Sequence, residues 1–305
     1  MQRQEQEPFK CKFSAYLKNV RNLSTLLKSV HFKDTASCKI SELGISFLLE
    51  ESRCVFAKCI ITHSVFEEYT YESPVGLTED IQGPGREAYD EEGSVVFEVN
   101  LAILLTCLNT FGTANVPTGY EGQGYSGHGA SGSTTAVKIT YDGPGTTLNF
   151  VLEDDGIVTT CRIPTCDSEE SMLFDFNEDS HAKIILKSEW LEEGLRDLDA
   201  TSDRVVMRLS TVIPHLRISS LGTIENLDVN YSLGDVLESF QFPYDRPIES
   251  SYNFVHVLHA LRACQVAQKA TILIDDNAFM KMQFLIPAAE RKWMYTEYSF
   301  SPLEL

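Results

Sequence analysis

Three polar side chains near the start of the chain, Arg21, Thr25 and Lys28, follow one another at helical spacing. The segment 19–31 reads NVRNLSTLLKSVH, and its apolar residues recur on the opposite side with the period of an amphipathic helix. Arginine and lysine on one helix face can hold phosphate oxygens. The sequence therefore predicts a short helix with one apolar face and one polar, basic face.

Two other sequence patterns are similar to functional motifs, but neither has the surrounding residues or elements that its motif requires. Gly122, Gly124 and Gly127 have the spacing of a dinucleotide-binding loop, but a loop precedes them and a β-pattern follows. That motif requires a strand before it and a helix after it. His256 and His259 are three residues apart with no glutamate between them, so they do not form the zinc-protease motif. We therefore favour a flexible Gly-rich insertion and expect no cofactor.

The eight cysteines include no Cys-x-x-Cys motif. Cys54/Cys59 and Cys161/Cys166 are pairs five residues apart, and this spacing puts two side chains on opposite faces of a strand. We expect free thiols in a reducing compartment and no metal site.

The composition is that of a folded, acidic protein. The chain has 305 residues, 43% of them hydrophobic, with 25 Lys and Arg against 44 Asp and Glu, for a formal charge of −19. This length favours two domains. The net charge argues against nucleic-acid binding, but a protein can be acidic in sum and basic along one surface. No apolar run reaches the roughly 20 residues of a membrane span, and we expect an intracellular protein.

A strand followed by a short amphipathic helix recurs along the chain, amid many β-rich segments. Further helices are predicted over 101–111, 189–199 and 250–264, with Asn100 as an N-cap and Gly112 as a helix end. The series of elements in the first half occurs again in the second. Such internal repetition indicates an α+β fold with two similar domains rather than a doubly wound sheet.

The predicted domains cover 1–166 and 181–305, with loop insertions at 73–93 and 113–133 in the first. The segment 167–180 between them is acidic, with embedded apolar residues. It is either a plain surface linker or a connector whose apolar residues form one wall of a peptide groove. The groove residues would be Met172, Leu173, Phe174 and Phe176.

Nearly the whole chain resembles the PCNA-like DNA sliding clamps. The resemblance lies in the two-domain pattern and in the stretches NVRNLSTLLKSVHF, GISFLLEESRCVFAKCIITHSVFEEY, LAILLTCLNTFG and GIVTTC. The acidic connector and Leu195–Asp199 are similar as well. Within the family, these stretches are most similar to the middle subunit of the heterotrimeric DNA-damage checkpoint clamp.

The resemblance implies the DNA-clamp fold, in which each domain has two short helices packed on antiparallel sheets. Three related subunits would close into a ring around duplex DNA, and the helices would line the hole without reading sequence. The residues expected to face DNA are Lys18, Arg21, Lys28, Arg196, His259 and Arg262. The third helix departs from this pattern because Glu189, Glu192 and Glu193 dominate its polar side. Either the subunit contacts DNA asymmetrically, or its neighbours supply most of the charge, or these are plain solvated faces.

Clamp rings join through edge strands, so the resemblance also implies interface residues. One edge would be the strand 156–164 and the other the strand near 223–231. The residues expected there are Gly156, Val158, Thr160, Arg162, Ile224, Asn226 and Asp228.

The expected partners are two related clamp subunits, an ATP-dependent clamp loader, duplex DNA, and repair and checkpoint proteins. No membrane is expected, and nuclear localisation follows from the resemblance alone. The alternative function is a metal-dependent 3′–5′ DNA exonuclease, which would need carboxylates gathered around two metal ions. Acids are plentiful but fall in turns and in the connector, where acids are common anyway. We therefore expect a non-catalytic subunit.

Overall fold

The computed structural model describes residues 12–73, 93–112, 114, 134–168, 176–179, 181–222, 226–234, 236–288 and 292–303. The chain forms two compact units. Unit 1 consists of residues 1–27, 34–47 and 60–170, and unit 2 of residues 28–33, 48–59 and 171–305. The predicted domain limits at 166 and 181 stay a prediction, and the units are described one at a time.

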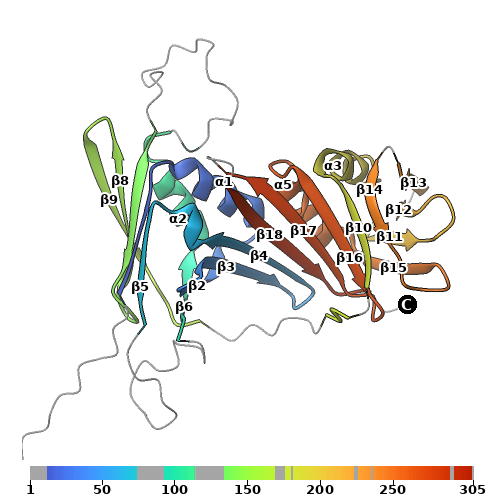
Figure 1. Cartoon of the computed structure of the whole chain (residues 1–305), viewed down its shortest axis with the longest axis horizontal. Helices are drawn as coiled ribbons and strands as arrows, with labels where there is room; N and C mark the ends of the chain where they lie inside the picture. The colour runs from blue at the N-terminus through green and yellow to red at the C-terminus, as the bar shows by residue number, and fades with distance from the viewer. Residues whose placement is uncertain are drawn as a thin grey trace, which may run out of the picture. The chain divides into compact units, whose positions relative to one another are not determined.

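Unit 1 is built on an antiparallel five-stranded sheet (Figure 1). Alternate residues along its inner strands are buried, as in Phe13, Ala15 and Leu17, because successive side chains point to opposite faces of a strand. The strand order is β5 (Glu68–Glu72), β1 (Lys12–Leu17), β7 (Ala136–Tyr141), β8 (Thr147–Asp154) and β9 (Ile157–Pro164).

A second antiparallel pairing in unit 1 joins β2 (Thr35–Ser41) to β6 (Val95–Asn100). The strands β3 (Gly44–Glu51) and β4 (Val55–Thr62) contribute residues to both units. A short 3₁₀ turn, η1 (His63–Val65), precedes β5. The strand β5 follows this turn and starts at Glu68.

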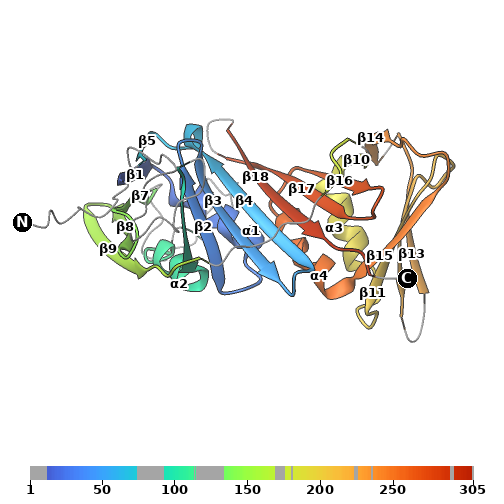
Figure 2. The same cartoon turned by 90° about the horizontal axis from the view of Figure 1, so that it is seen from below.

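Unit 2 contains two groups of antiparallel strands (Figure 2). The first has the order β14 (Leu237–Gln241), β10 (His181–Lys187), β16 (Lys269–Asp275), β17 (Met280–Pro287) and β18 (Trp293–Phe300). The second has the order β13 (Asn226–Tyr231), β12 (Leu216–Leu221), β11 (Arg204–Leu209) and β15 (Ile248–Asn253). The α+β class predicted from the pattern is confirmed.

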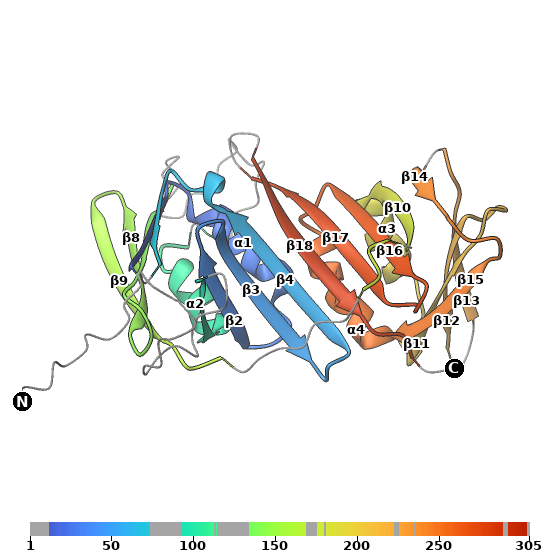
Figure 3. The same cartoon turned by 60° about the horizontal axis from the view of Figure 1, so that its bottom comes forward.

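The helices are short, and each follows closely on a strand except α5, which follows α4 (Figure 3). The Asn100 side chain accepts a hydrogen bond from the Ile103 amide at 2.9 Å, so the predicted N-cap is confirmed. The helices are α1 (Val20–Val30), α2 (Leu101–Leu108), α3 (Ser188–Arg196), α4 (Phe254–His259) and α5 (Leu261–Cys264).

The predicted helix over 250–264 was wrong in its first four residues, which end strand β15. Ser250 and Tyr252 are buried and pair with β11. Asn253 then caps α4 by accepting from the His256 amide at 3.2 Å. Pairing with β11 therefore outweighs the local helical period until the capping residue is reached.

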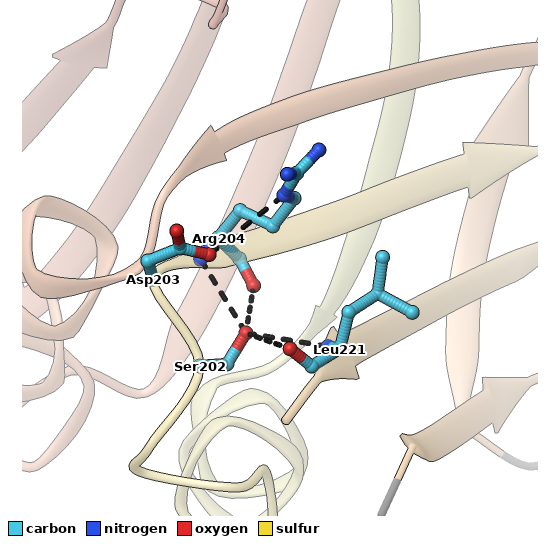
Figure 4. Close-up of polar contacts among 4 residues, drawn as sticks. All are labelled: Ser202, Asp203, Arg204 and Leu221. Atoms are coloured by element: carbon cyan, nitrogen blue, oxygen red, sulfur yellow. Dashed lines mark hydrogen bonds and ion pairs between the residues drawn. The ribbon is translucent and has the colours of Figure 1, made fainter. Parts of the chain in front are cut away.

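A serine hydroxyl fastens the start of β11 to the end of β12 (Figure 4). The Ser202 Oγ lies 2.6 Å from the Arg204 carbonyl oxygen, to which it donates, and 3.2 Å from the Leu221 amide nitrogen, from which it accepts. Asp203 and Arg204 form an exposed ion pair beside it at 3.7 Å.

Within the described residues, no helix combines the length and apolar character of a membrane span.

Candidate functional site

The polar side of α1 is narrower than its sequence pattern indicates. Seven of the eleven residues are buried, including Ser24 and Ser29, and Arg21, Thr25 and Lys28 are half-buried. Lys18, just before the helix, is exposed. The Arg21 amide donates to the Asn19 side chain at 2.9 Å, which fixes the helix start.

Burial lowers the pKa of the Lys28 ammonium from the ordinary value of a lysine, because desolvation disfavours the charged form. An anion placed against Lys28 would oppose that change, because an opposite charge favours the charged form. Lys18 lies just before α1, and Arg21 and Lys28 are two helical turns apart along it, with the polar Thr25 between them. We call these three cations the α1 patch.

The polar side of α3 is acidic, as the sequence predicts. Arg196 lies 2.7 Å from Glu192, one helical turn away, and Glu189 and Glu193 are exposed. The pair largely cancels the Arg196 charge at short range. Trp190, also on α3, is 37% exposed.

The His259 ring on α4 is held inside unit 2. Its Nε2 lies 3.0 Å from a carboxylate oxygen of Glu51, and its plane stacks on Phe32 with 4.6 Å between the ring centroids. Burial is the main cause that lowers the His259 pKa, and Glu51 opposes it. Arg262 on α5 is exposed. Of these two predicted DNA-facing residues, Arg262 is exposed, whereas the His259 ring is in contact with Glu51 and Phe32.

The strand β9 ends the five-stranded sheet and pairs with β8 on one side. Asp155 and Gly156 between the two strands have φ values of 47° and 80°, which is the conformation of a two-residue type I′ turn. The flanking pair Asp154 and Ile157 is then hydrogen-bonded, and pairs alternate from there along the ladder.

This alternation settles which backbone groups of β9 face away from β8. The amide and carbonyl groups of 158, 160, 162 and 164 point to the open edge, and those of 157, 159, 161 and 163 point to β8. The side chains of the first set are all exposed, Val158 by 58%. Pro164 stands at an outward position, where a missing N–H breaks no sheet hydrogen bond.

The strand β13 ends the four-stranded group of unit 2 and pairs with β12. Asn226 and Asp228 are exposed on it, and the Asp228 carboxylate lies 3.8 Å from Arg217 on β12. Ile224, predicted beside them, lies outside the described residues. Both strands predicted as subunit edges thus have an edge position in their own sheets.

Of the predicted groove residues, Phe176 alone lies in the described part of the chain, and Met172, Leu173 and Phe174 fall outside it. Phe176 is buried, and the Lys281 ammonium sits 4.4 Å above its ring centroid. The neighbouring Asn177 amide donates to Asp275 at 3.0 Å. This end of the connector is therefore fastened to the β16–β17 end of unit 2.

Two acids that a metal-dependent nuclease could have used, Asp154 and Asp275, have structural partners. Asp154 accepts a hydrogen bond of 2.5 Å from Thr135, and Asp275 accepts from the backbone amides of 177, 277 and 279. Among the described residues, no group of three His, Cys, Asp or Glu side chains is placed to hold a metal ion.

Two contacts had no signal in the sequence. The Glu51–His259 pair joins residues 208 positions apart, and Lys281 reaches Phe176 from a different strand. The outward position of Pro164, in contrast, could have been read from the sequence, because proline in a strand is confined to edges and strand ends.

The fold is that of the sliding clamps. A solved structure of PCNA from Thermococcus kodakaraensis superimposes with a TM-score of 0.67, and the match covers 95% of this chain and all of that one at 12% sequence identity. The PCNA-like clamp fold predicted from the sequence is thereby confirmed.

The family is defined by sequence. The chain belongs to the family described as Repair protein Rad1/Rec1/Rad17, whose profile matches residues 12–286. It is 32% identical to the mouse cell cycle checkpoint protein RAD1 and 31% identical to the human one, over 95% of this chain and 92% and 91% of theirs. A protein of Mycosarcoma maydis named DNA repair exonuclease REC1 is 22% identical over 92% of this chain and 80% of its own length.

Proposed function

We propose that the protein is a non-catalytic subunit of a ring-shaped heterotrimeric clamp that encircles duplex DNA at damage sites. The observation that carries this proposal is the position of β9 and β13 at sheet edges, together with the outward backbone groups of β9. A neighbouring subunit's edge strand could pair with these groups and extend the sheet, which is an efficient way to join two chains. The clamp fold shared with PCNA supports the ring in this proposal.

The α1 patch would be the main DNA contact of this subunit. Phosphate contacts hold DNA without specifying sequence, as a sliding protein requires. The acidic side of α3 would lie apart from the phosphates or face them across water, so the contact would be asymmetric. Arg262 would add a cation from α5.

The same proposal covers the position of this subunit in the ring, the loader, the docking partners and the localisation. This chain would be the middle subunit of the ring, an ATP-dependent loader would open and close that ring, and repair and checkpoint proteins would dock on it in the nucleus. The connector 167–180 would contribute to their docking. The names of the mouse and human relatives, which are checkpoint proteins, support this setting.

A charge-reversal pair tests the DNA contact. With Arg21→Glu and Lys28→Glu together, we expect the assembled ring to dissociate faster from circular nicked DNA. The log–log slope of binding against salt should fall by about two, because each phosphate contact contributes about one. The measurement is retention of the ring on immobilised circular DNA over a salt series.

The matched control is Lys12→Glu with Lys138→Glu, two exposed lysines on neighbouring strands of the five-stranded sheet. It changes the net charge by the same amount away from α1 and should leave retention unchanged. Equal loss in both variants would attribute retention to net charge and remove the role of the α1 patch.

The exonuclease alternative is tested on the same preparations. With Mg²⁺ or Mn²⁺ and end-labelled DNA, we expect no degradation beyond that of buffer. Degradation that Asp154→Asn abolishes, in a variant that still folds, would establish a catalytic subunit instead.

A further inference from the structure

Two cysteines that the proposed DNA and subunit surfaces do not use lie together in unit 1. Cys107 is on α2 and Cys161 is on β9, and these two elements pack against each other. Cys161 is the interaction partner of the Cys107 thiol that, beside burial, raises the pKa of Cys107. Both thiols are partly accessible and neither is in a disulfide.

The alternation of β9 explains why Cys161 faces the helix. Cys161 shares a strand face with the buried Ile163 and pairs in register with the buried Phe150. Its side chain therefore points to the inner side of the sheet, where α2 lies (Figure 2). On α2, Cys107 follows Leu104 by one turn and precedes Leu108, both buried.

We propose that Cys107 and Cys161 are a redox-active thiol pair, which a peroxide converts into an intramolecular disulfide that ties α2 to the edge strand β9. Two thiols on elements that pack against each other need less backbone movement to bond than unrelated surface thiols, which must first find each other. The proposal rests on unit 1 alone and does not depend on the proposed function.

The chemistry balances with hydrogen peroxide as the oxidant. The Cys161 thiolate attacks one peroxide oxygen, the O–O bond breaks, and hydroxide leaves and is protonated to water, which produces a sulfenic acid. The Cys107 sulfur then attacks the sulfenic sulfur, the S–O bond breaks, and a second water leaves. Two thiols lose two electrons and two protons, and one peroxide becomes two waters.

The environment of Cys107 indicates which of the two thiols attacks the peroxide and which one closes the disulfide. Burial and the neighbouring Cys161 raise the pKa of the Cys107 thiol to about 11, so Cys107 is the resolving rather than the attacking thiol. Because the resolving step needs the Cys107 thiolate, disulfide closure should speed up about tenfold per pH unit between pH 7 and pH 9.

The other described cysteines serve as internal standards. Cys166 is exposed and lies only five positions from Cys161, Cys54 is half-buried, and Cys38, Cys59 and Cys264 are buried. Indiscriminate oxidation would reach the exposed Cys166 first. A pair selected by geometry would instead react in preference to it.

The test uses the reduced full-length protein with a small molar excess of hydrogen peroxide. Remaining thiols are then blocked with iodoacetamide, and non-reduced digests are mapped by mass spectrometry. We expect one linked peptide pair that joins Cys107 to Cys161 and an intact mass lower by two hydrogen atoms before alkylation. The same link should form in Cys166→Ser and be lost in Cys161→Ser.

Other results overturn the proposal. These are a link from Cys166 to either cysteine as the main product, independent sulfinic acids at Cys107 and Cys161, or oxidation of Cys166 while the pair stays reduced. Because the mapping works on the wild-type protein, a Cys161→Ser variant that failed to fold would not remove the test.

Discussion

Proline in place of Thr160 is expected to weaken association with the neighbouring clamp subunit by about a hundredfold. The Thr160 amide faces the open edge of β9 and would be a donor to the partner strand. Proline removes that donor and places its ring where the partner backbone would lie, at a cost of about 3 kcal/mol or more, which is roughly two orders of magnitude in affinity. Sedimentation velocity with each candidate partner measures the effect.

The strand itself should tolerate this substitution, because no hydrogen bond to β8 starts at the Thr160 nitrogen. Pro164 already occupies an equivalent outward position in the same strand. Thr160→Ala is the matched control, since it removes the same side chain but keeps the N–H, and it should assemble normally. Unchanged association of the proline variant with both partners would show that β9 is not a subunit edge.

Alanine at Gly44 is expected to destabilise unit 1 by about 3 to 5 kcal/mol, from the sum of backbone strain and steric overlap. Gly44 has a φ of 145°, a conformation that side chains rarely adopt. A Cβ atom there would sit 2.1 Å from the Ile61 carbonyl oxygen. Because the obstacle is backbone within a sheet, it cannot rotate away as a side chain would. Urea unfolding of wild type and variant measures the loss.

Gly112→Ala is the matched control for Gly44→Ala. Gly112 also has a positive φ, 74°, but a Cβ atom there would meet nothing within 4 Å. This variant should lose only the conformational cost of about 1 kcal/mol. Equal losses in the two variants would mean that the close approach of Ile61 relaxes and that φ alone sets the cost.

The elements that were predictable are those with strong local signals. The period of 19–31 and the Asn100 cap located α1 and the start of α2. At 250–253 the local period favoured helix, but pairing with β11 makes this segment strand. A local pattern cannot reveal a strand partner more than forty residues away.

The residues of the candidate site were likewise predictable only where the signal was local in the sequence. Residue types placed Arg21 and Lys28 on one helix face, but how much of α1 is covered depends on what packs over it. Nothing near His259 in the sequence indicates that Glu51 and Phe32 hold its ring, because these residues meet only after folding. The edge position of β9 came from the resemblance, and the alternation of its backbone came from the turn.

The two-residue turn at Asp155–Gly156 fixes which residues of β9 face the open edge and which face β8. Even-numbered residues there present their backbone groups to the open edge and have exposed side chains, whereas odd-numbered residues point their backbone groups to β8 and, from Thr159 on, have covered side chains. A single inserted or deleted residue within β9 would exchange the two sets beyond that point, bringing threonine and arginine into the core and cysteine and isoleucine to the surface. Length changes in this hairpin should therefore be tolerated in steps of two residues rather than one.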